Sequence, residues 1–332
     1  MTTTLNVDQA KGLVAEALVA SNTSLPNAAS VSAALVSAEL WGQVGHGLRR
    51  TVAYAAQARA GKVDGHAVPH ADQPRPGLLH VDAAHGFAYP ALDLVLDRLP
   101  NMAMSQGIAM AGIFRSHHCG VTGLVVDALA RKGLVAMMFA NAPAAMAPWG
   151  GNRALFGTNP VAFATPVDNA EPLVIDLSLS KVARGKIMAA NQKGEPIPEG
   201  WALDVDGQPT TDAKAGLEGF MVPAGDAKGV ALALMVEMLC AGITGANYSY
   251  EATSFFDASG DPPGVGQSII AIDPSAFGPH IGERMTALVT AMAETEGARV
   301  PGVRRHGLAK EIEAKGITVD DALMADIQAI SA

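Results

Sequence analysis

The segment GHGLRR places a histidine, His46, four residues before an arginine, Arg50. Histidine is the side chain best suited to give and take a proton near neutral pH. The arginine guanidinium is a forked, permanently charged partner for a carboxylate. Together they describe a site for a 2-oxo acid or a cyclic imino acid, in which Arg50 holds the carboxylate and His46 protonates the atom that receives charge. The structural alternative is a helix-capping histidine beside a surface arginine.

A second segment, SHHCGVTG at residues 116–123, follows an expected strand and opens an expected helix. Backbone N–H groups at a helix start can receive a cofactor phosphate or carboxamide. Adjacent histidines also invite a metal site. However, neighbours in sequence point in different directions and no acidic or cysteine partner has suitable spacing, so we expect no metal. Nothing in the sequence activates the Cys119 thiol, which makes buried packing its expected role.

Three further segments contain ligand-binding residue types. The turns at residues 149–152 and 156–160 contain glycines that allow close backbone approach, and Thr158 or Asn159 can hydrogen-bond a ligand. Residues 181–186, KVARGK, gather three cations in an acidic chain, which suggests a site for a substrate carboxylate or cofactor phosphates. Residues 299–305, RVPGVRR, hold arginines close together and would suit a 2′-phosphate, which favours NADP over NAD. Each segment has a structural alternative. The first would be two plain turns, residues 181–186 a solvated helix face, and residues 299–305 a solvated basic loop.

The elements around His46 must form a turn between two helices. Apolar positions at helical spacing predict a helix capped by Asn27, and three glycines within residues 42–47 should end it. A second helix is expected over residues 48–61. His46 should therefore lie in a turn rather than on a helix face.

Strand-like apolar runs dominate the rest of the chain. Strands are expected at residues 78–83, 107–114, 134–141, 160–167, 173–179 and 268–274, and helices at 90–99, 123–133, 227–243 and 280–296. The first two runs after residue 106, with a helix between them, form a βαβ-like unit. The amphipathic stretch from Leu308 should pack outside the sheet, back onto the N-terminal helices. The long segment 191–225 is rich in Gly, Pro and Asp, and Trp201 argues for order within it.

Composition narrows the class of protein. The 332 residues are 49% hydrophobic and 17% charged, which allows a large core and about two domains. We expect no membrane segment and no signal peptide. The net charge of −9 gives no global footprint for nucleic acid. The two cysteines, Cys119 and Cys240, are too far apart for a CxxC site and give no disulfide framework, so a reducing cytoplasm is the expected compartment.

Common nucleotide and hydrolase motifs are missing. The sequence contains neither a GxGxxG after a strand nor a GxxxxGK[ST], a GxSxG or an HExxH. A nicotinamide cofactor would therefore have to bind by a route other than the standard dinucleotide fold.

In combination and in order, these segments resemble the type-2 malate/L-lactate dehydrogenase family, which is distinct from the Rossmann-fold dehydrogenases of the same substrates. The resemblance covers nearly the whole chain, through HGLRR, SHHCGVTG, PWGG, FGTNP, IDLSLSKVARGK, AKG and RVPGVRR. The phrases DAAHGFAYPALD, NAPAAMAPWGG, ARGKIMAANQKGEPIPEGWALD and SFFDASGDPPGVGQ are most similar to its Δ1-piperideine-2-carboxylate/Δ1-pyrroline-2-carboxylate reductases.

The resemblance implies an α/β (α+β-like) fold. A large mixed, mainly antiparallel sheet would form a non-Rossmann NAD(P)-binding domain at residues 116–305. A helical substrate domain would be built from both chain ends, residues 1–115 and 306–332. The resemblance also implies a homodimer with the active site near the subunit boundary.

The resemblance assigns roles residue by residue. His46 would be the proton donor, with Lys186 in the position of a further catalytic residue, and Arg50, Thr158, Arg184 and Gly185 would bind substrate. The cofactor would be bound by His118, Cys119, Gly120, Val121, Thr122, Asp176, Leu177, Ser178, Lys228, Arg299, Pro301, Gly302, Arg304 and Arg305.

The sequence departs from the family pattern at two positions. Gly45 stands where members usually have serine before the catalytic histidine, and Lys186 stands where the piperideine-carboxylate reductases have an aspartate. The three-residue proton relay is therefore incomplete. A lysine close to His46 would also lower the pKa of that histidine by like-charge repulsion.

Three functions remain open from the sequence. The first is an NAD(P)H-dependent reductase of cyclic 2-imino acids that gives L-pipecolate or L-proline, with NADPH the more favoured cofactor. The second is a 2-hydroxy-acid dehydrogenase acting on malate, lactate, sulfolactate or ureidoglycolate, which Lys186 favours. The third is a non-catalytic binding protein that kept the scaffold.

Overall fold

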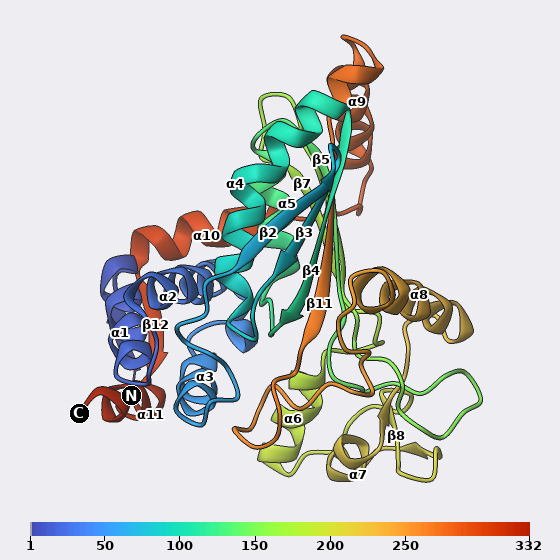
Figure 1. The fold of residues 1–332 in the computed structure, drawn as a ribbon. Coiled ribbons are helices and arrows are strands. Elements are labelled where there is room, and N and C mark those ends of the chain that lie inside the picture. The colour runs from blue at the N-terminus through green and yellow to red at the C-terminus, as the bar shows by residue number, and fades with distance from the viewer. Residues whose placement is uncertain (1) are drawn as a thin grey trace.

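The computed structural model describes residues 2–332, and a seven-stranded mixed sheet lies at its centre (Figure 1). The strand order is β2-β3-β4-β11-β5-β6-β7. Only the β3–β4 pair is parallel, and every other neighbouring pair is antiparallel. The strands are β2 (His70–Arg75), β3 (Leu78–Asp82), β4 (Ile108–Ser116), β5 (Val135–Ala140), β6 (Val161–Thr165), β7 (Leu173–Leu177) and β11 (Val265–Ile272). This confirms the predicted large, mainly antiparallel mixed sheet.

The βαβ-like unit is split by a strand from far along the chain. β4 and β5 are joined by α5 (Thr122–Ala130), but β11 lies between them and pairs antiparallel with both. Ile270 of β11 is opposite Met110 on one side and Met137 on the other. Apolar runs predicted each of these three strands, but they carry no information about this long-range insertion.

Both chain ends meet in one helical layer at the side of the sheet (Figure 1). β1 (Thr2–Leu5) pairs antiparallel with β12 (Ile317–Asp320). α10 (Val303–Lys315) contacts α2 (Leu25–Leu40), and α11 (Asp321–Ser331) contacts α1 (Val7–Val19) and α3 (Arg50–Arg59). The expectation that the C-terminal stretch packs onto the N-terminal helices is confirmed.

Two predicted helix boundaries are wrong. The cap of α2 is Ser24 rather than Asn27, because Pro26 is tolerated in the first helical turn. The Asn27 side chain instead donates to the carbonyls of Gly65 and Ala67, each at 2.9 Å. α4 (Ala88–Gln106) extends well past the predicted end and contains Pro100 within it. Its buried apolar face against the sheet outweighs the backbone hydrogen bond that proline removes.

The segment after β7 forms a separate small lobe. It contains α6 (Arg184–Lys193), α7 (Ala213–Glu218) and α8 (Ala227–Glu237), which continues into a π-helical turn, η2 (Met238–Gly242). Three short strands, β8 (Ala202–Leu203), β9 (Pro209–Thr210) and β10 (Phe220–Met221), pair in the order β10-β8-β9. A second apolar cluster joins this lobe to Phe139 of β5, and the half-buried Trp201 packs against it, so the predicted order of this segment is confirmed.

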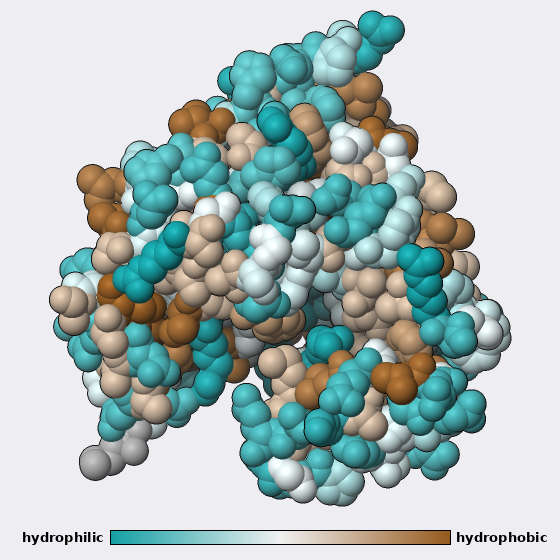
Figure 2. Space-filling view, turned by 60° about the horizontal axis from the view of Figure 1, so that its bottom comes forward, coloured by the Kyte–Doolittle hydropathy of each residue, from teal (hydrophilic) through white to brown (hydrophobic). Residues whose placement is uncertain are grey.

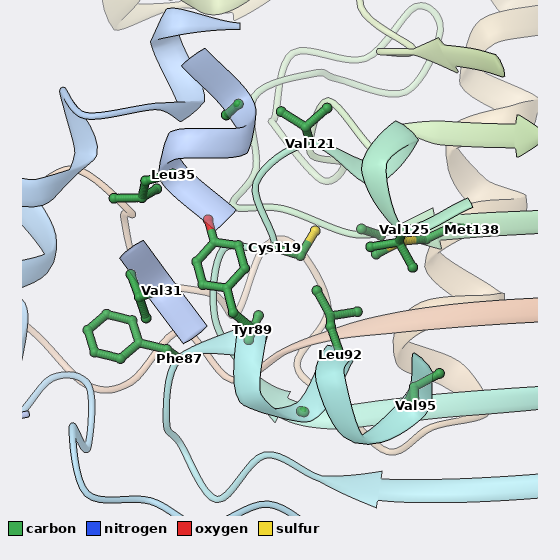
Figure 3. Close-up of a cluster of buried hydrophobic side chains, with 14 of the residues drawn as sticks. Val31, Leu35, Phe87, Tyr89, Leu92, Val95, Cys119, Val121, Val125 and Met138 are labelled. Carbon is green, nitrogen blue, oxygen red and sulfur yellow. The ribbon is translucent and has the colours of Figure 1, made fainter. Parts of the chain in front are cut away.

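The main core lies between the sheet and helices α2, α4 and α5. Figure 3 shows how Tyr89, Leu92 and Val125 pack there around the Cys119 side chain. The backbone of residues 118–121 is therefore anchored from its buried side. The remaining elements are the 3₁₀ turns η1 (Val44–His46) and η3 (Pro274–Phe277) and the helix α9 (Ile281–Glu294).

The division into domains at residues 115 and 306 stays a prediction. Two strands of the central sheet, β2 and β3, lie before the first boundary, β4 runs across it, and α10 runs across the second. Within residues 2–332, no helix is long and apolar enough to cross a membrane.

Candidate active site

His46 lies in the turn that the glycines predicted, at the end of η1 and between α2 and α3. Gly47 is required there, because an added Cβ would lie 2.2 Å from Oε1 of Glu39. That carboxylate accepts a hydrogen bond from the Leu48 N–H at 2.8 Å, and burial raises the pKa of Glu39. The buried Glu39 carboxylate thus holds the backbone of the turn that carries His46.

The structure joins His46 to the second predicted segment through a pair of imidazoles. Nδ1 of His46 lies 3.0 Å from Nε2 of His118, and the rings stack with centroids 5.0 Å apart. On its other side, Nδ1 of His118 lies 2.5 Å from the Tyr54 hydroxyl, which in turn lies 3.2 Å from the Tyr89 hydroxyl. A continuous hydrogen-bonded chain therefore runs from His46 into the core.

Sequence reasoning missed Tyr54. A signal was available, because Tyr54 follows Arg50 by four residues and the two therefore share one face of α3. His117 was also left without a role. It is buried against the rings of Tyr54, Phe87 and Phe255, and neither of its ring nitrogens has a hydrogen-bond partner among the described residues.

Burial keeps all three histidines uncharged. It lowers the pKa of His46 to about 4, helped by the positive charge of Arg50. It lowers the pKa of His117 to about 3, with smaller effects of Arg50 and Lys62, and holds the pKa of His118 well below its usual range. Nε2 of His46 has no hydrogen-bond partner within residues 2–332. At pH 7 it is a neutral nitrogen able to accept a proton.

These pKa values predict acid sensitivity. The folded-state pKa values of His46 and His117 lie below the value of 6.5 for an ordinary histidine, so the unfolded chain binds protons first as the pH falls. The contribution that these neutral histidines make to the free energy of unfolding is complete above pH 6.5. It should be lost at about 1.4 kcal/mol per pH unit for each histidine, as the pH falls towards their folded pKa values.

Thermal denaturation midpoints measured from pH 7.5 to 4.5 should therefore stay level down to about pH 6.5 and fall below it. His117→Phe should make this dependence less steep, since it removes one of the three histidines whose pKa is lowered. A midpoint that does not change with pH would contradict the buried neutral histidines.

The guanidinium of Arg50 lies beside His46 with its two terminal nitrogens unpaired among the described residues. Its Nε donates to the Gly45 carbonyl at 2.8 Å, and its guanidinium lies 4.6 Å from the centre of the Phe256 ring. The two terminal nitrogens have no hydrogen-bond partner in the part of the chain that the structure describes. An arginine held by its Nε and stacked on a ring is well placed to bind a carboxylate through two parallel hydrogen bonds.

Several predicted cofactor residues come together at Asp176. One carboxylate oxygen accepts from the Thr122 hydroxyl at 2.8 Å, and the other accepts from the Gly123 N–H at 3.2 Å. Arg305 pairs with the same carboxylate at 3.5 Å and donates to the Asp176 carbonyl at 3.2 Å. Gly302 has φ of +88° and lies against Val174, where an added Cβ would be 3.0 Å from the backbone nitrogen. One surface is thus formed by three segments: the start of α5, the end of β7 and the 299–305 loop.

A further contact links the 156–160 turn with the end of β7. The Ser178 hydroxyl contacts the Thr158 carbonyl at 3.4 Å and lies 2.6 Å from the Ser180 hydroxyl. Thr158 is half-buried, and Leu177 is exposed. Burial raises the pKa of Cys119 to about 12, so the thiol stays protonated, as expected of a packing residue.

The cations of residues 181–186 lie in the small lobe. Arg184 donates to the Leu217 carbonyl at 3.0 Å, and burial lowers its pKa. The Lys186 ammonium lies 5.9 Å from the Trp201 ring, and among the described residues neither Arg184 nor Lys186 forms a hydrogen bond or ion pair with His46. Figure 2 shows a hollow between the helical layer and the small lobe. Within residues 2–332, no side-chain hydrogen bond or ion pair is formed by the remaining predicted residues, Gly120, Val121, Gly185, Lys228, Arg299, Pro301 and Arg304. Of these, Gly185, Lys228, Arg299 and Arg304 are exposed.

No metal centre is visible in residues 2–332, where no group of three or more His, Cys, Asp or Glu side chains is arranged to hold an ion. The site therefore consists of an uncharged imidazole pair, a free guanidinium and a glycine-rich surface around a helix start.

A family model described as malate/L-lactate dehydrogenase matches residues 5–328. The chain belongs to this family.

Similar proteins cover the whole chain. The (2R)-3-sulfolactate dehydrogenase (NADP(+)) of Chromohalobacter salexigens is 48% identical, covering 99% of this chain and 98% of that protein. A Δ1-pyrroline-2-carboxylate/Δ1-piperideine-2-carboxylate reductase of Pseudomonas putida is 40% identical, covering 86% and 84%. The crystal structure of Δ1-piperideine-2-carboxylate reductase from Pseudomonas syringae superposes with a TM-score of 0.94 at 35% identity, covering 99% and 100%.

Membership of the malate/L-lactate dehydrogenase family confirms the predicted enzyme class, an NAD(P)-dependent oxidoreductase. The named relatives differ in substrate, one being a dehydrogenase of 3-sulfolactate and the other a reductase of pyrroline- and piperideine-2-carboxylates. Family membership therefore fixes the type of reaction without fixing the substrate.

Proposed function

We propose that this enzyme interconverts a 2-hydroxy acid and the corresponding 2-oxo acid, using NADP. The observation that carries the proposal is the neutral His46, backed by His118 and set beside the free guanidinium fork of Arg50. Arg50 binds the substrate carboxylate, and His46 accepts the hydroxyl proton as the alcohol is oxidised. In the reverse direction His46 returns that proton to the oxygen.

The choice of an alcohol over an imine follows from where a proton is needed. An oxygen at carbon 2 must lose a proton during oxidation, whereas a cyclic imine can arrive already protonated and makes less use of a base. Lys186 replaces the relay aspartate of the piperideine-carboxylate reductases, which favours the same interpretation. The sulfolactate dehydrogenase relative, at 48% identity, gives further support.

The hydrogen-bonded chain suits a base at Nε2 of His46. In that arrangement Nδ1–H of His46 donates to Nε2 of His118, and Nδ1–H of His118 donates to the Tyr54 oxygen. This assignment of the hydrogens leaves the lone pair of Nε2 free for the substrate. Tyr54 then donates to Tyr89. The buried chain holds His46 in one tautomer and one orientation.

The residues around the 299–305 loop fit an adenosine phosphate. A cavity of about 360 Å³ adjoins the loop and is lined mainly by apolar side chains, among them Val167, Leu173, Val289 and Pro301. Arginines beside an apolar cavity suit an adenine ring with a 2′-phosphate, which supports NADP over NAD. When bound, the nicotinamide accepts a hydride from carbon 2 or returns it. His118 to Thr122, Asp176 to Ser178, Lys228 and the 299–305 loop would hold the cofactor.

Assembly and compartment complete the proposal. We infer a homodimer with its active site near the subunit boundary. Exposed Leu234, Met235 and Met238 on α8 and η2, with Ile243 just beyond, support it, because contiguous exposed apolar side chains often mark an interface. Cys119 and Cys240 are both free and buried, which is consistent with a reducing cytoplasm.

A substrate panel tests the proposed function. Initial rates are measured with malate, lactate, both enantiomers of 3-sulfolactate and ureidoglycolate, each with NADP⁺ and with NAD⁺. We expect rapid oxidation of at least one hydroxy acid, with a higher kcat/KM for NADP⁺ as cosubstrate. Turnover of none of them at any pH from 7 to 10 would refute it.

A second candidate function is reduction of cyclic 2-imino acids to L-pipecolate or L-proline. It is favoured by the close superposition with a piperideine-2-carboxylate reductase and by the similar phrases around Trp149 and Trp201. Consumption of NADPH with Δ1-piperideine-2-carboxylate, in an enzyme that leaves every hydroxy acid of the panel unchanged, would make this the function.

Replacing Tyr54 by phenylalanine should lower kcat by about 10- to 100-fold, since a buried nitrogen of His118 loses its partner at a cost of about 1–3 kcal/mol. KM for the substrate should change little, because Arg50 keeps its contacts. Steady-state kinetics measure both values, with Tyr250→Phe, an exposed tyrosine, as the matched control. An unchanged kcat would separate Tyr54 from the reaction.

A further inference from the structure

The irregular loop of residues 253–261 forms one wall of the site. The ring of Phe255 is buried and lies 5.3 Å from the centres of both the His117 and His118 rings. The next residue, Phe256, lies under the guanidinium of Arg50. One short stretch of loop therefore packs against both the imidazole pair and the proposed carboxylate ligand.

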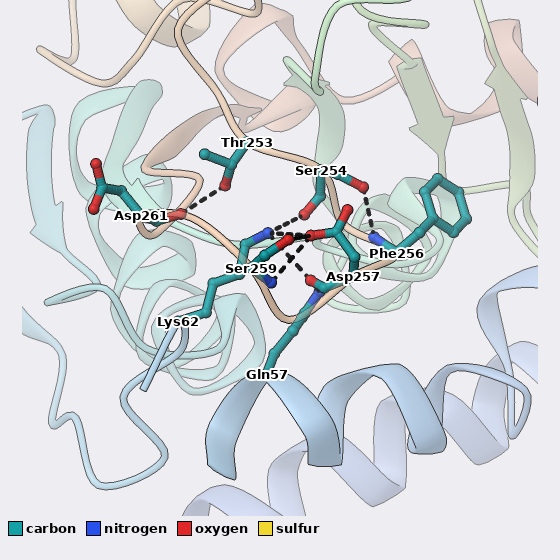
Figure 4. Close-up of polar contacts among 8 residues, drawn as sticks. All are labelled: Gln57, Lys62, Thr253, Ser254, Phe256, Asp257, Ser259 and Asp261. Atoms are coloured by element: carbon teal, nitrogen blue, oxygen red, sulfur yellow. Dashed lines mark hydrogen bonds and ion pairs between the residues drawn. The ribbon is translucent and has the colours of Figure 1, made fainter. Parts of the chain in front are cut away.

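The loop has no helix or strand to hold it, and its anchor is a buried lysine. Nζ of Lys62 donates to the carbonyls of Ser254 at 2.8 Å and Asp257 at 3.1 Å. Gln57 donates to the same Asp257 carbonyl at 2.9 Å. Figure 4 shows both side chains reaching from the α3 region into the turn of the loop. The anchors thus come from the helix that also carries Arg50 and from the turn that follows it.

The backbone bonds of Lys62 matter more than its ion pair. The side chain of Lys62 is 1% exposed, whereas that of Asp257 is 52% exposed, and the carboxylate contact is longer, at 3.3 Å. An exposed carboxylate contributes little to such a pair. A buried ammonium without its carbonyl partners would be costly, so the lysine and the loop hold each other in place.

We propose that Lys62 is a positioning residue of the active site: through the carbonyls of Ser254 and Asp257 it fixes the loop that sets Phe255 against His118 and Phe256 under Arg50. The proposal rests on the roles given above to His118 and Arg50. Lys62 touches neither substrate nor cofactor in this account. It acts on the substrate through the loop.

Lys62→Met tests the proposal, because methionine keeps the apolar stem and removes the donor. We expect kcat/KM to fall by about 10- to 100-fold, with a rise in KM from displaced Arg50 and a fall in kcat from displaced His118. Hydrogen exchange of residues 253–261, measured on the same protein, should become faster while the central strands keep their protection. Asp257→Asn should stay within about twofold of wild type, since it spares the backbone bonds.

Two further variants serve as controls for Lys62→Met. Lys315→Met removes an exposed pair on α10 and should change nothing. Phe256→Leu leaves the anchor intact and should raise KM with little change in kcat; this variant serves if Lys62→Met fails to fold. Wild-type kinetics for Lys62→Met, or an unchanged KM for Phe256→Leu, would overturn the proposal.

The exchange measurement needs no substrate, so it separates this inference from the proposed function. If the enzyme reduces only cyclic imines, the kinetic comparison is made with that substrate and the loop is tested all the same. Unaltered exchange of residues 253–261 in Lys62→Met would refute the anchor whatever the substrate is.

Discussion

Replacing His46 by asparagine should lower kcat for hydroxy-acid oxidation by about 10²- to 10⁴-fold, the range expected when a general base is removed. Asparagine can occupy the turn, but its amide cannot accept a proton at neutral pH. The dissociation constant of the cofactor, measured by calorimetry, should stay near the wild-type value. The pH profile of kcat/KM in the wild type should fall only as the pH approaches about 4, where His46 becomes protonated. That acid limb should vanish in the variant.

The matched control for this experiment is His70→Asn. His70 lies on β2, is exposed, and contacts only Asp72 among the described side chains. It should leave kcat and cofactor binding unchanged. If His46→Asn weakened cofactor binding as much as it slowed turnover, His46 would be a binding residue and the assignment of the base would be wrong.

Replacing Arg50 by lysine should raise KM for the substrate by about 10- to 100-fold, with a smaller effect on kcat. The charge is kept, but an ammonium is a point charge and cannot make two parallel bonds to a carboxylate, a difference worth about 1.5–3 kcal/mol. Lysine would also lose the bond from Nε to the Gly45 carbonyl and much of the stacking on Phe256. Steady-state kinetics at saturating cofactor measure the effect.

The neighbouring arginine supplies the control for that substitution. Arg49 is exposed and pairs with Asp320 near the C-terminus. Arg49→Lys should give wild-type kinetics with at most a small loss of stability, since exposed ion pairs contribute little. Equal effects of the two substitutions would remove Arg50 from the site.

Much of the fold could be predicted because its signals are local. The glycines around His46 marked the turn, and alternating apolar runs marked all but one of the strands of the large sheet. The missed strand, β2, is almost wholly exposed and carries no apolar pattern. The place of β11 between β4 and β5 depends on pairing across more than a hundred residues, which periodicity cannot encode. The cap at Ser24 was missed because Asn27, an equally good cap, is used instead to hold the Gly65 region.

The sequence predicted separate segments of the candidate site, and only the fold shows that they lie together. His46 and His118 are 72 residues apart, and nothing local announces that their rings meet. Helical spacing places Tyr54 on the face of Arg50 but does not indicate its contact with His118, and Lys62 carries no motif that predicts its contact with the 253–261 loop. Asp176 could be linked to the cofactor only by resemblance, whereas its bonds to Thr122 and Arg305 give it a physical role.

The transfer of deuterium from carbon 2 of the substrate tests the central claim most directly. The hydroxy acid that the enzyme oxidises fastest is prepared with deuterium at carbon 2 and incubated with NADP⁺, and the reduced cofactor is analysed by mass spectrometry. The account predicts one deuterium in each reduced cofactor from the wild-type enzyme, and product formation slowed by about 10²- to 10⁴-fold in His46→Asn. Reduced cofactor without deuterium, or a His46→Asn enzyme as fast as wild type, would contradict it.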